Sequence, residues 1–470
     1  MHSPRTPLLA ACLLASGTSC GASAEGPAPA SPWNVLIVTV DTLRADHLSC
    51  YGYFRDTSPR IDALAAESVL FESCTAPISH TQPSHASLFT GTYPLEHGTL
   101  SNLATLAGGH GGPPFAATPE LRTLAQHLLE AGYRTGAFVS ASPVKRESGL
   151  DAGFDAWDEP DELARASRDT QRLASVWMLE QAEVPFLCWL HLFDPHRAYT
   201  TLPEEYARLY RTDDELLAVL ERRGASLELT PVDDVRGIVK ETVDIRAMAN
   251  LYDGAVRYVD DAVGAVLDDL RAHDLLESTL VVLTADHGEG IGQHGEVDHG
   301  HLWREQLWVP LIVRAPGAAP RRVSERLSLV DALPTAFGLA PGLPVEGFLA
   351  QCSGRDVLRG EPLPVFSMLP KRRPDAPMTL AIELDGWRFL RSTGGAEALF
   401  DLGSDPFELV NLRNRRPEKA DELRAALLAL QAELERRGER HEALRARDGM
   451  PPPSQDFLQE LNALGYGGEE

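Results

Sequence analysis

The sequence has no excess of positive charge and no long membrane-spanning run. Its 470 residues carry 43 Lys and Arg against 68 Asp and Glu, which gives a formal net charge of −25. Binding to a nucleic-acid backbone needs clustered Lys and Arg, so we expect no nucleic-acid partner. The apolar run at residues 8–15 is too short to cross a bilayer as a mature helix.

Cysteine is also scarce, with six in the whole chain. Four lie beyond the N-terminal segment, too few for a disulfide scaffold of this size, although Cys50 and Cys74 could form one bridge. Cys188 lies within the apolar run at residues 186–192 and is expected in the core. No pair of cysteines has zinc-finger spacing, and the chain has no internal repeat.

Apolar runs alternate with helical patterns along most of the chain. The composition, 43% hydrophobic and 24% charged, is typical of a globular protein. Runs at residues 34–40, 135–140, 186–192 and 279–284 predict buried strands, and residues 60–67, 119–130, 163–181 and 239–273 predict helices. This alternation predicts an α/β fold with a mostly parallel central sheet and helices on both faces. The Asp residues of 239–273 are expected on a solvated face.

The pattern changes near residue 362. Short runs at residues 365–368, 378–382 and 387–390 predict a small antiparallel sheet, and a leucine stripe predicts one helix at residues 417–437, ended by Gly438. We therefore expect a main domain at residues 34–360 and a C-terminal subdomain at residues 361–470.

Residues 1–24 have the pattern of an export signal, with Arg5, an apolar stretch and then small residues. Two outcomes remain open. Cleavage before Cys20 would leave a lipidated cysteine that attaches the protein to a membrane, whereas cleavage after Ala24 would release a soluble protein. Residues 25–33 form a flexible tether in either case. We expect the protein to be exported: periplasmic, extracellular or lipid-anchored to a bacterial envelope.

Three stretches that are far apart in the sequence carry residues expected at one ligand-binding site. Asp41 ends the first predicted strand, and Asp286 and His287 follow another. The carboxyl ends of parallel strands are where open α/β sheets bind ligands. Thr81 lies at the mouth of a predicted helix, with Pro83 fitting the first helical position, and free N–H groups at such a mouth receive an oxyanion.

These stretches resemble the sulfatase family of the alkaline phosphatase superfamily. The segment TQPSHASLFTG at residues 81–91 resembles the sulfatase signature, and VDTLRAD at residues 40–46 its first metal-binding strand end. Further matches are DPH at 194–196, DHGE at 286–289, VPLIV at 309–313 and LFDL at 399–402, followed by Asp405 and Pro406. Together they cover about residues 34 to 412.

The resemblance implies a divalent metal held by Asp41, Asp286 and His287, with Thr81 as the metal-activated nucleophile. It also implies catalytic roles for three histidines, namely His85, His196 and His299. At the position of Thr81, sulfatases carry a Cys or Ser that becomes formylglycine. A threonine cannot undergo this maturation, which is therefore excluded. At the position of His85, sulfatases carry an Arg. Sulfatases also carry an Asp where this chain has Thr42, so one oxygen ligand for calcium is missing. The imidazole of His287 favours zinc or manganese as the metal, and calcium stays possible.

The leading hypothesis is therefore a hydrolase that cleaves a small anionic sulfate or phosphate ester through a covalent Thr81 intermediate. Alternatives within the superfamily are a phosphodiesterase or phosphonate hydrolase, or a transferase of the phospho group. A third is an inactive binding protein on this scaffold, suggested by the missing Arg at position 85. His191 is interpreted as a core histidine, while His294 and His301 are left between a solvated role and a site role.

Overall fold

The computed structural model describes residues 33–102, 114–199, 201–227, 230–233, 240–361, 363–371, 376–445 and 459. All of them belong to one compact unit, Pro32–Glu470. The predicted export signal, Cys20 and almost all of the predicted tether lie outside the described residues. The predicted boundary at residue 360 stays a prediction.

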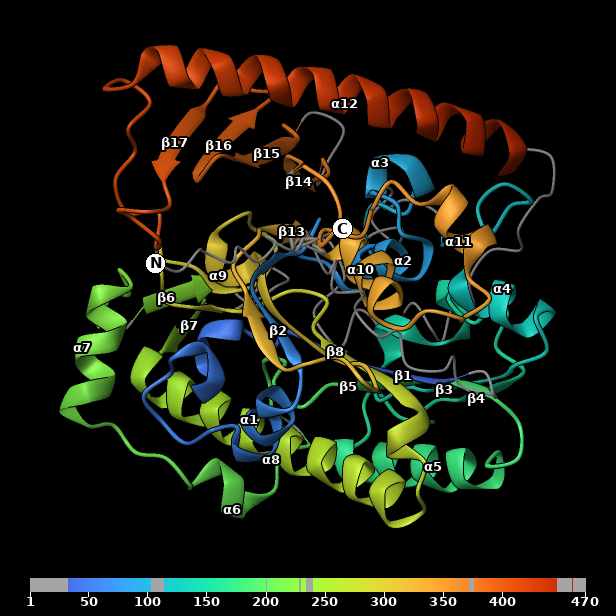
Figure 1. The fold of residues 1–470 in the computed structure, drawn as a ribbon. Coiled ribbons are helices and arrows are strands. Elements are labelled where there is room, and N and C mark those ends of the chain that lie inside the picture. Colours follow the sequence, from blue (N-terminus) through green and yellow to red (C-terminus); the bar gives the residue numbers. More distant parts are fainter. Residues whose placement is uncertain are drawn as a thin grey trace, which may run out of the picture. The chain divides into compact units, whose positions relative to one another are not determined.

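A nine-stranded sheet forms the centre of the fold (Figure 1). Along the sheet the order is β12 (Arg321–Val323), β2 (Val69–Thr75), β11 (Trp308–Arg314), β8 (Thr279–Thr284), β1 (Asn34–Val40), β5 (Phe186–Leu192), β3 (Arg134–Phe138) and β4 (Ala156–Asp158), with β13 (Leu327–Ser328) paired to β2. Only β11 runs antiparallel to its neighbours, β2 and β8. The predicted mostly parallel sheet is confirmed.

Helices cover both faces of this sheet, as predicted (Figure 1). One face carries α1 (Pro59–Ala66), α5 (Ser167–Glu180) and α8 (Ile245–Ala272); the other carries α2 (Thr81–Thr90), α4 (Leu124–Glu130) and α10 (Ala332–Leu339). Every residue of β1, β5 and β8 is buried. This explains why these strands are continuous apolar runs rather than alternating ones.

The remaining helices and strands are short. They are α3 (Pro94–His97), α6 (Glu204–Ala207), α7 (Asp214–Arg222), α9 (Arg304–Leu307), α11 (Glu346–Gln351), β6 (Thr230–Asp233), β7 (Lys240–Val243), β9 (Gly290–Ile291) and β10 (Val297–Asp298). Strands β9 and β10 form a hairpin, which brings Asp298 to the edge of the site described below.

Two aspartates of α8 correct the expectation of a solvated acidic face. Asp253 and Asp260 are fully buried. Asp260 accepts hydrogen bonds from the backbone N–H groups that begin α1, including that of Ile61 at 2.7 Å. Asp253 accepts from Tyr53 and Arg55, both at 2.8 Å. Asp260 faces the protein because α8 packs against α1, and Asp253 because the segment that carries Tyr53 and Arg55 covers α8. Helical periodicity alone reveals neither contact.

The C-terminal part forms the predicted antiparallel sheet under one helix (Figure 1). Its strands are β14 (Val365–Leu369), β15 (Thr379–Leu384), β16 (Trp387–Ser392) and β17 (Glu397–Asp401), and the helix is α12 (Pro417–Arg445). Leu423, Leu427 and Leu434 are buried in a second apolar cluster between the helix and the sheet. This stripe on the helix explains its docking.

Helix α12 does not end at Gly438, as the sequence predicts, but continues to Arg445. A Cβ atom on residue 438 would lie only 2.0 Å from the backbone oxygen of Leu95 in α3. Glycine is therefore required here for the close approach of two helices, and not for a helix end.

The four described cysteines are free thiols, so Cys50 and Cys74 form no bridge in this structure. Cys188 is fully buried, as expected for a core residue, and burial raises the pKa of its thiol.

Candidate active site

The predicted metal donors meet at the carboxyl ends of two neighbouring strands. Asp41 follows β1, and Asp286 and His287 follow β8, its parallel neighbour. One donor atom from each residue lies within 4.8 Å of the others, and all three side chains are buried. The structure thus brings together three residues that are up to 246 positions apart in the chain.

Hydrogen bonds orient these donors toward a common point. The Nδ1 atom of His287 lies 2.9 Å from the backbone oxygen of Gly288, which requires the proton on Nδ1 and turns the lone pair of Nε2 inward. One carboxylate oxygen of Asp286 accepts from the N–H groups of Thr42 and His287. The other oxygen, both oxygens of Asp41 and Nε2 of His287 are buried without hydrogen-bond partners.

This donor set fits a divalent cation. Burial raises the pKa of Asp41 well above its usual range, and the neighbouring Asp286 raises it further. Burial likewise raises the pKa of Asp286 and lowers that of His287. Two buried carboxylates beside a neutral imidazole therefore leave charge uncompensated, and unpaired buried polar atoms are costly. A metal ion bound by these atoms would supply both the charge and the partners.

Thr81 lies beside this set, at the start of α2. The helix begins at Thr81 rather than at Pro83, and His80 is the residue that precedes it. Pro83 is still tolerated, because the first four N–H groups of a helix have no partner within the helix. Thr81 is fully buried, and its side chain is close enough to lower the pKa of the Asp41 carboxyl, against the effect of burial.

His85 lies one helical turn beyond Thr81 and points into the protein. Its Nδ1 is 2.9 Å from the backbone oxygen of Thr81, and its Nε2 is 3.0 Å from the hydroxyl oxygen of Thr39 in β1. Burial lowers the pKa of His85 to about 4, so the ring is neutral at neutral pH. These contacts support a positioning role, in which His85 fixes the start of α2 against β1.

His191 is buried as the sequence predicts, but it is not remote from the site. Its Nε2 lies 3.6 Å from a carboxylate oxygen of Asp41, and its ring centroid lies 5.2 Å from that of His85. The strand register explains this position, and no local sequence pattern encodes it. His191 pairs with Thr39, and Thr39 shares a sheet face with Asp41 two residues later.

His196 and His299 lie next to the same donors. Their Nε2 atoms are 3.2 Å apart, and the ring centroid of His299 lies 4.4 Å from that of His287. His196 follows β5, whereas His299 follows the β9–β10 hairpin. All the predicted catalytic and metal-binding side chains therefore lie in one cluster.

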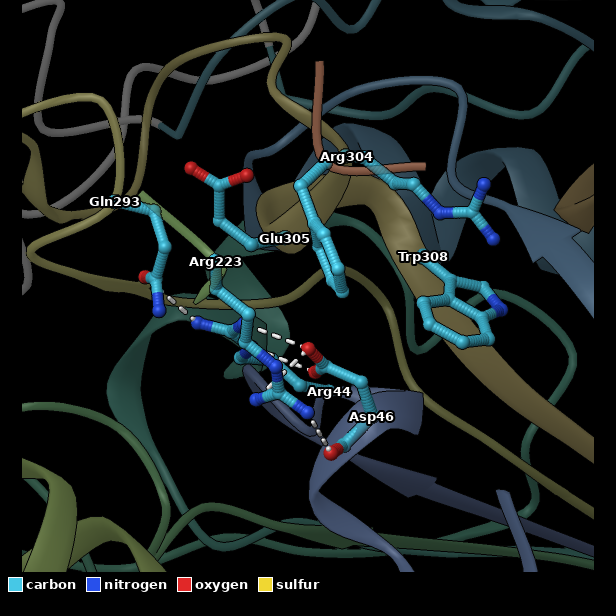
Figure 2. A pocket seen from close by; sticks show the side chains of 8 residues that line it. Arg44, Asp46, Arg223, Gln293, Arg304, Glu305 and Trp308 are labelled. Atoms are coloured by element: carbon cyan, nitrogen blue, oxygen red, sulfur yellow. Dashed lines mark hydrogen bonds and ion pairs between the residues drawn. The ribbon is translucent and has the colours of Figure 1, made fainter. Parts of the chain in front are cut away.

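A small pocket near Arg44 is separate from this cluster (Figure 2). Arg44 and Arg223 both pair with the carboxylate of Asp46, at 2.9 and 3.0 Å. These ion pairs hold the pKa of Asp46 below its usual range, against the opposing effect of burial. None of the predicted metal donors lines the pocket, and both guanidinium groups are already paired. We therefore place the candidate active site at the strand ends.

The C-terminal segment anchors the loop that carries His299. Glu408 accepts a hydrogen bond from the N–H of Arg304 at 2.9 Å and pairs with Arg388 at 2.9 Å. Arg388 also donates to the backbone oxygen of Leu302. Residues 302–304 are thus held by the small sheet and by the segment that follows it.

The two histidines left open by the sequence take different positions. His294 stacks on Trp303, with ring centroids 3.9 Å apart, and its Nδ1 lies 3.1 Å from Glu305. His301 lies 3.2 Å from Glu296, with 36% of its side chain exposed. His294 therefore belongs to the anchored loop, whereas His301 faces solvent in part.

Fold and site together define a hydrolase of the alkaline phosphatase superfamily. The profile of the family described as Sulfatase matches residues 33–343. The chain is 26% identical to "Uncharacterized sulfatase YidJ" of Escherichia coli over 69% of this chain and 72% of that protein. It is 24% identical to an "Ulvan-active sulfatase" of Formosa agariphila over 82% of this chain and 77% of that protein. This chain belongs to the sulfatase family and is a hydrolase of ester bonds.

A solved structure supports the same fold. The phosphonate monoester hydrolase of Agrobacterium radiobacter superposes with a TM-score of 0.66 at 20% identity, covering 86% of this chain and 96% of that one.

Proposed function

We propose that this protein is a metal-dependent hydrolase that cleaves a sulfate or phosphate ester through a covalent Thr81 intermediate. The observation that carries the proposal is the position of Thr81 at the start of α2, beside buried donors of Asp41, Asp286 and His287 that have no hydrogen-bond partner. A hydroxyl needs activation before it can act as a nucleophile. Asp41, Asp286 and His287, next to this hydroxyl, would hold an activating ion.

The donor chemistry favours zinc or manganese over calcium. His287 offers an imidazole nitrogen, which suits zinc and manganese, whereas calcium takes oxygen ligands in larger number. Thr42 stands where sulfatases carry a further carboxylate, so the oxygen set is reduced. A divalent ion bound here would lower the pKa of the Thr81 hydroxyl and offset the negative charge of the ester.

The protein's own groups divide the remaining tasks. His85 holds the start of α2 against β1, and the positive end of the helix dipole at this start attracts the anionic ester. Thr81 gives up its hydroxyl proton to solvent, and its oxygen bonds to sulfur or phosphorus as the bond from that atom to the ester oxygen breaks. His196 and His299, whose Nε2 atoms are 3.2 Å apart, supply the proton that the departing oxygen takes. Water then attacks the same sulfur or phosphorus atom, gives one proton back to the histidine pair and displaces the Thr81 oxygen.

Phosphoryl substrates are slightly favoured over sulfuryl ones. A formylglycine hydrate has a second hydroxyl on the same carbon and can expel sulfate without water attacking sulfur. Thr81 has no second hydroxyl, so its ester must be opened at sulfur or phosphorus. A phosphodiesterase or phosphonate hydrolase is therefore the second candidate.

Comparison of matched esters tests both candidates. We expect kcat/KM for nitrophenyl phosphate or methylphosphonate to equal or exceed that for nitrophenyl sulfate in metal-loaded protein, with Thr81→Ala protein as the blank. A sulfate rate far above both others, lost in the Thr81→Ala protein, would contradict the phosphoryl preference and leave a sulfatase without formylglycine. No Thr81-dependent cleavage of any ester would favour the inactive binding protein.

We also propose that the protein is exported. Arg5, the apolar stretch at residues 8–15 and the small residues that follow support an export signal. In the described part of the chain, no helix combines the length and apolarity that crossing a membrane requires. Mass spectrometry of the mature N-terminus distinguishes a lipidated Cys20 from a chain that begins at residue 25. An intact residue 1 in exporting cells would contradict the proposal.

A further inference from the structure

A buried hydrogen-bond network connects β5 and β1 to the start of α2. The indole Nε1 of Trp189 in β5 donates to the hydroxyl oxygen of Thr39 in β1 at 2.9 Å. The same hydroxyl oxygen lies 3.0 Å from Nε2 of His85, and Nδ1 of His85 lies 2.9 Å from the backbone oxygen of Thr81. These four residues are fully buried, so solvent does not compete for the bonds.

The chemistry of the groups leaves one arrangement of protons in this network. An indole N–H only donates, so the oxygen of Thr39 accepts from Trp189. A backbone oxygen only accepts, so Nδ1 of His85 carries the proton of the neutral ring and Nε2 is an acceptor. The Thr39 hydroxyl therefore donates its own proton to His85. Each bond supports the next, and none can be reversed.

Thr39 joins two parts of the candidate site. It lies two residues before Asp41, and both side chains are on the same face of the sheet. Through His85 it also holds the backbone of Thr81, the first residue of α2. One hydroxyl group thus ties the start of α2 to the strand that ends at Asp41.

Trp189 fixes the direction of this hydroxyl. Its ring centroid lies 4.7 Å from that of Phe89 and 5.3 Å from that of His85, and both of these rings belong to α2. An indole packed among other rings presents its N–H in one direction, and the β-branched side chain of Thr39 has few rotamers. The helix therefore rests on Trp189 directly and through Thr39.

We propose that Thr39 is a positioning residue, whose hydroxyl, oriented by Trp189, fixes Thr81 at the start of α2 for the reaction. This inference rests on the proposed function, because it takes Thr81 as the nucleophile. A displacement of about 1 Å at a reacting group can cost about 100-fold in rate. The polar atoms of Thr39 and Trp189 are bonded to protein groups, so binding of ester and metal should depend little on them.

Two substitutions separate the hydroxyl from the shape of the side chain. Thr39→Val keeps the shape and removes the hydroxyl, whereas Thr39→Ser keeps the hydroxyl. In the metal-loaded full chain we expect kcat to fall about 10- to 100-fold in Thr39→Val, with KM and bound metal within about threefold of the unmodified protein. We expect Thr39→Ser to restore kcat to within about threefold.

Thr284→Val is the matched control. Thr284 pairs with Thr39 in the neighbouring strand β8, is fully buried and lies two residues before Asp286. Its hydroxyl donates to the backbone oxygen of Pro310 in β11 at 2.8 Å, and not to α2. The same substitution there removes a buried hydroxyl from the same sheet, and we expect kcat to stay within about threefold.

Hydrogen exchange gives a second readout that needs no turnover. Peptides that cover residues 76–91 report on the start of α2 by mass spectrometry. We expect faster exchange in Thr39→Val than in the unmodified protein, Thr39→Ser or Thr284→Val. The helix keeps another anchor, because the Ser84 hydroxyl donates to the backbone oxygen of Asp286 at 2.6 Å, so Thr39→Val should still fold.

Unchanged kcat and unchanged exchange in Thr39→Val would overturn the inference and leave the proposed function intact. Equal losses of kcat in Thr39→Val and Thr39→Ser, or in Thr39→Val and Thr284→Val, would also overturn it, because they would reflect a disturbed sheet. A protein that cleaves no ester but shows the expected exchange pattern would support the network and contradict the proposed function.

Discussion

At the scale of residues, Thr81 carries the proposed chemistry, and its hydroxyl can be tested apart from its size. Thr81→Ser keeps a hydroxyl at the start of α2, so we expect kcat/KM within about tenfold of the unmodified protein. Thr81→Ala removes the nucleophile, and we expect a loss of about 10³-fold or more. Initial rates on the best nitrophenyl ester measure both. Full activity in the Thr81→Ala protein would exclude a covalent Thr81 intermediate.

Asp260 gives a prediction about pH. Burial raises its pKa from 3.8 to about 7, although hydrogen bonds from the N–H groups of Ile61 and Arg60 lower it. At pH values between about 4 and about 7, Asp260 is protonated in the folded state and ionised in the unfolded state. The free energy of unfolding therefore falls as pH rises from about 4 to about 7, on the order of 1–3 kcal/mol.

We expect Asp260→Asn to remove this dependence, since an amide does not titrate and still accepts a hydrogen bond. The melting temperature of the unmodified protein should fall relative to that of Asp260→Asn between pH 5 and pH 7.5. Asp268→Asn, on the exposed side of the same helix, is the control. If the difference in melting temperature between the unmodified protein and Asp260→Asn stayed constant from pH 5 to pH 7.5, the prediction would be wrong.

The candidate site could be predicted only as far as strand ends and helix starts can be found in the sequence. Asp41, Asp286 and His287 follow apolar strand runs, so parallel strands bring them to one edge. His191 was interpreted as a core residue because its role depends on the register between β5 and β1, which no local pattern encodes. The positioning contacts of His85 depend on the orientation of a single ring.

At the scale of elements, the crossing of α12 over α3 can be tested by the direction in which a substitution at Gly438 changes the melting temperature. An exposed glycine inside a helix is stabilised by substitution with alanine, by about 1 kcal/mol. Gly438 is buried, and a Cβ atom there would meet the backbone of Leu95 at 2.0 Å. We therefore expect Gly438→Ala to lower the melting temperature. Glu439→Ala, at the exposed neighbouring position, is the control, and a rise for Gly438→Ala would show that the helices do not touch.

Element types were more predictable than their contacts. Continuous apolar runs identified β1, β5 and β8, because a strand covered on both faces has no polar alternation. The antiparallel direction of β11 was not predictable, since an apolar run has no direction. The contacts of Gly438, Asp253 and Asp260 were not predictable either. Gly438 and Asp260 are explained by a neighbouring helix, and Asp253 by Tyr53 and Arg55 in the segment before α1; all these neighbours are distant in sequence.

At the scale of the whole molecule, we expect metal to stabilise the fold. Zn²⁺ or Mn²⁺ bound by the folded state alone adds about 2.7 kcal/mol at a concentration of 100 Kd. The melting temperature of chelator-treated protein should therefore rise with metal concentration and level off only slowly. Scanning fluorimetry over a metal titration measures this. Asp41→Asn protein should show a smaller rise, and an unchanged melting temperature in the unmodified protein would contradict a site that joins β1 to β8.

The anchor at Glu408 also sets an order of events during synthesis. A chain is made from its N-terminus, so Asp41, Thr81, Asp286 and His299 all emerge from the ribosome before Glu408. The contacts of Glu408 with Arg304 and Arg388 hold residues 302–304 only once the small sheet exists. A nascent or truncated chain that stops before residue 408 therefore has every donor but lacks this anchor. Synthesis beyond residue 408 therefore completes the support of the loop that carries His299.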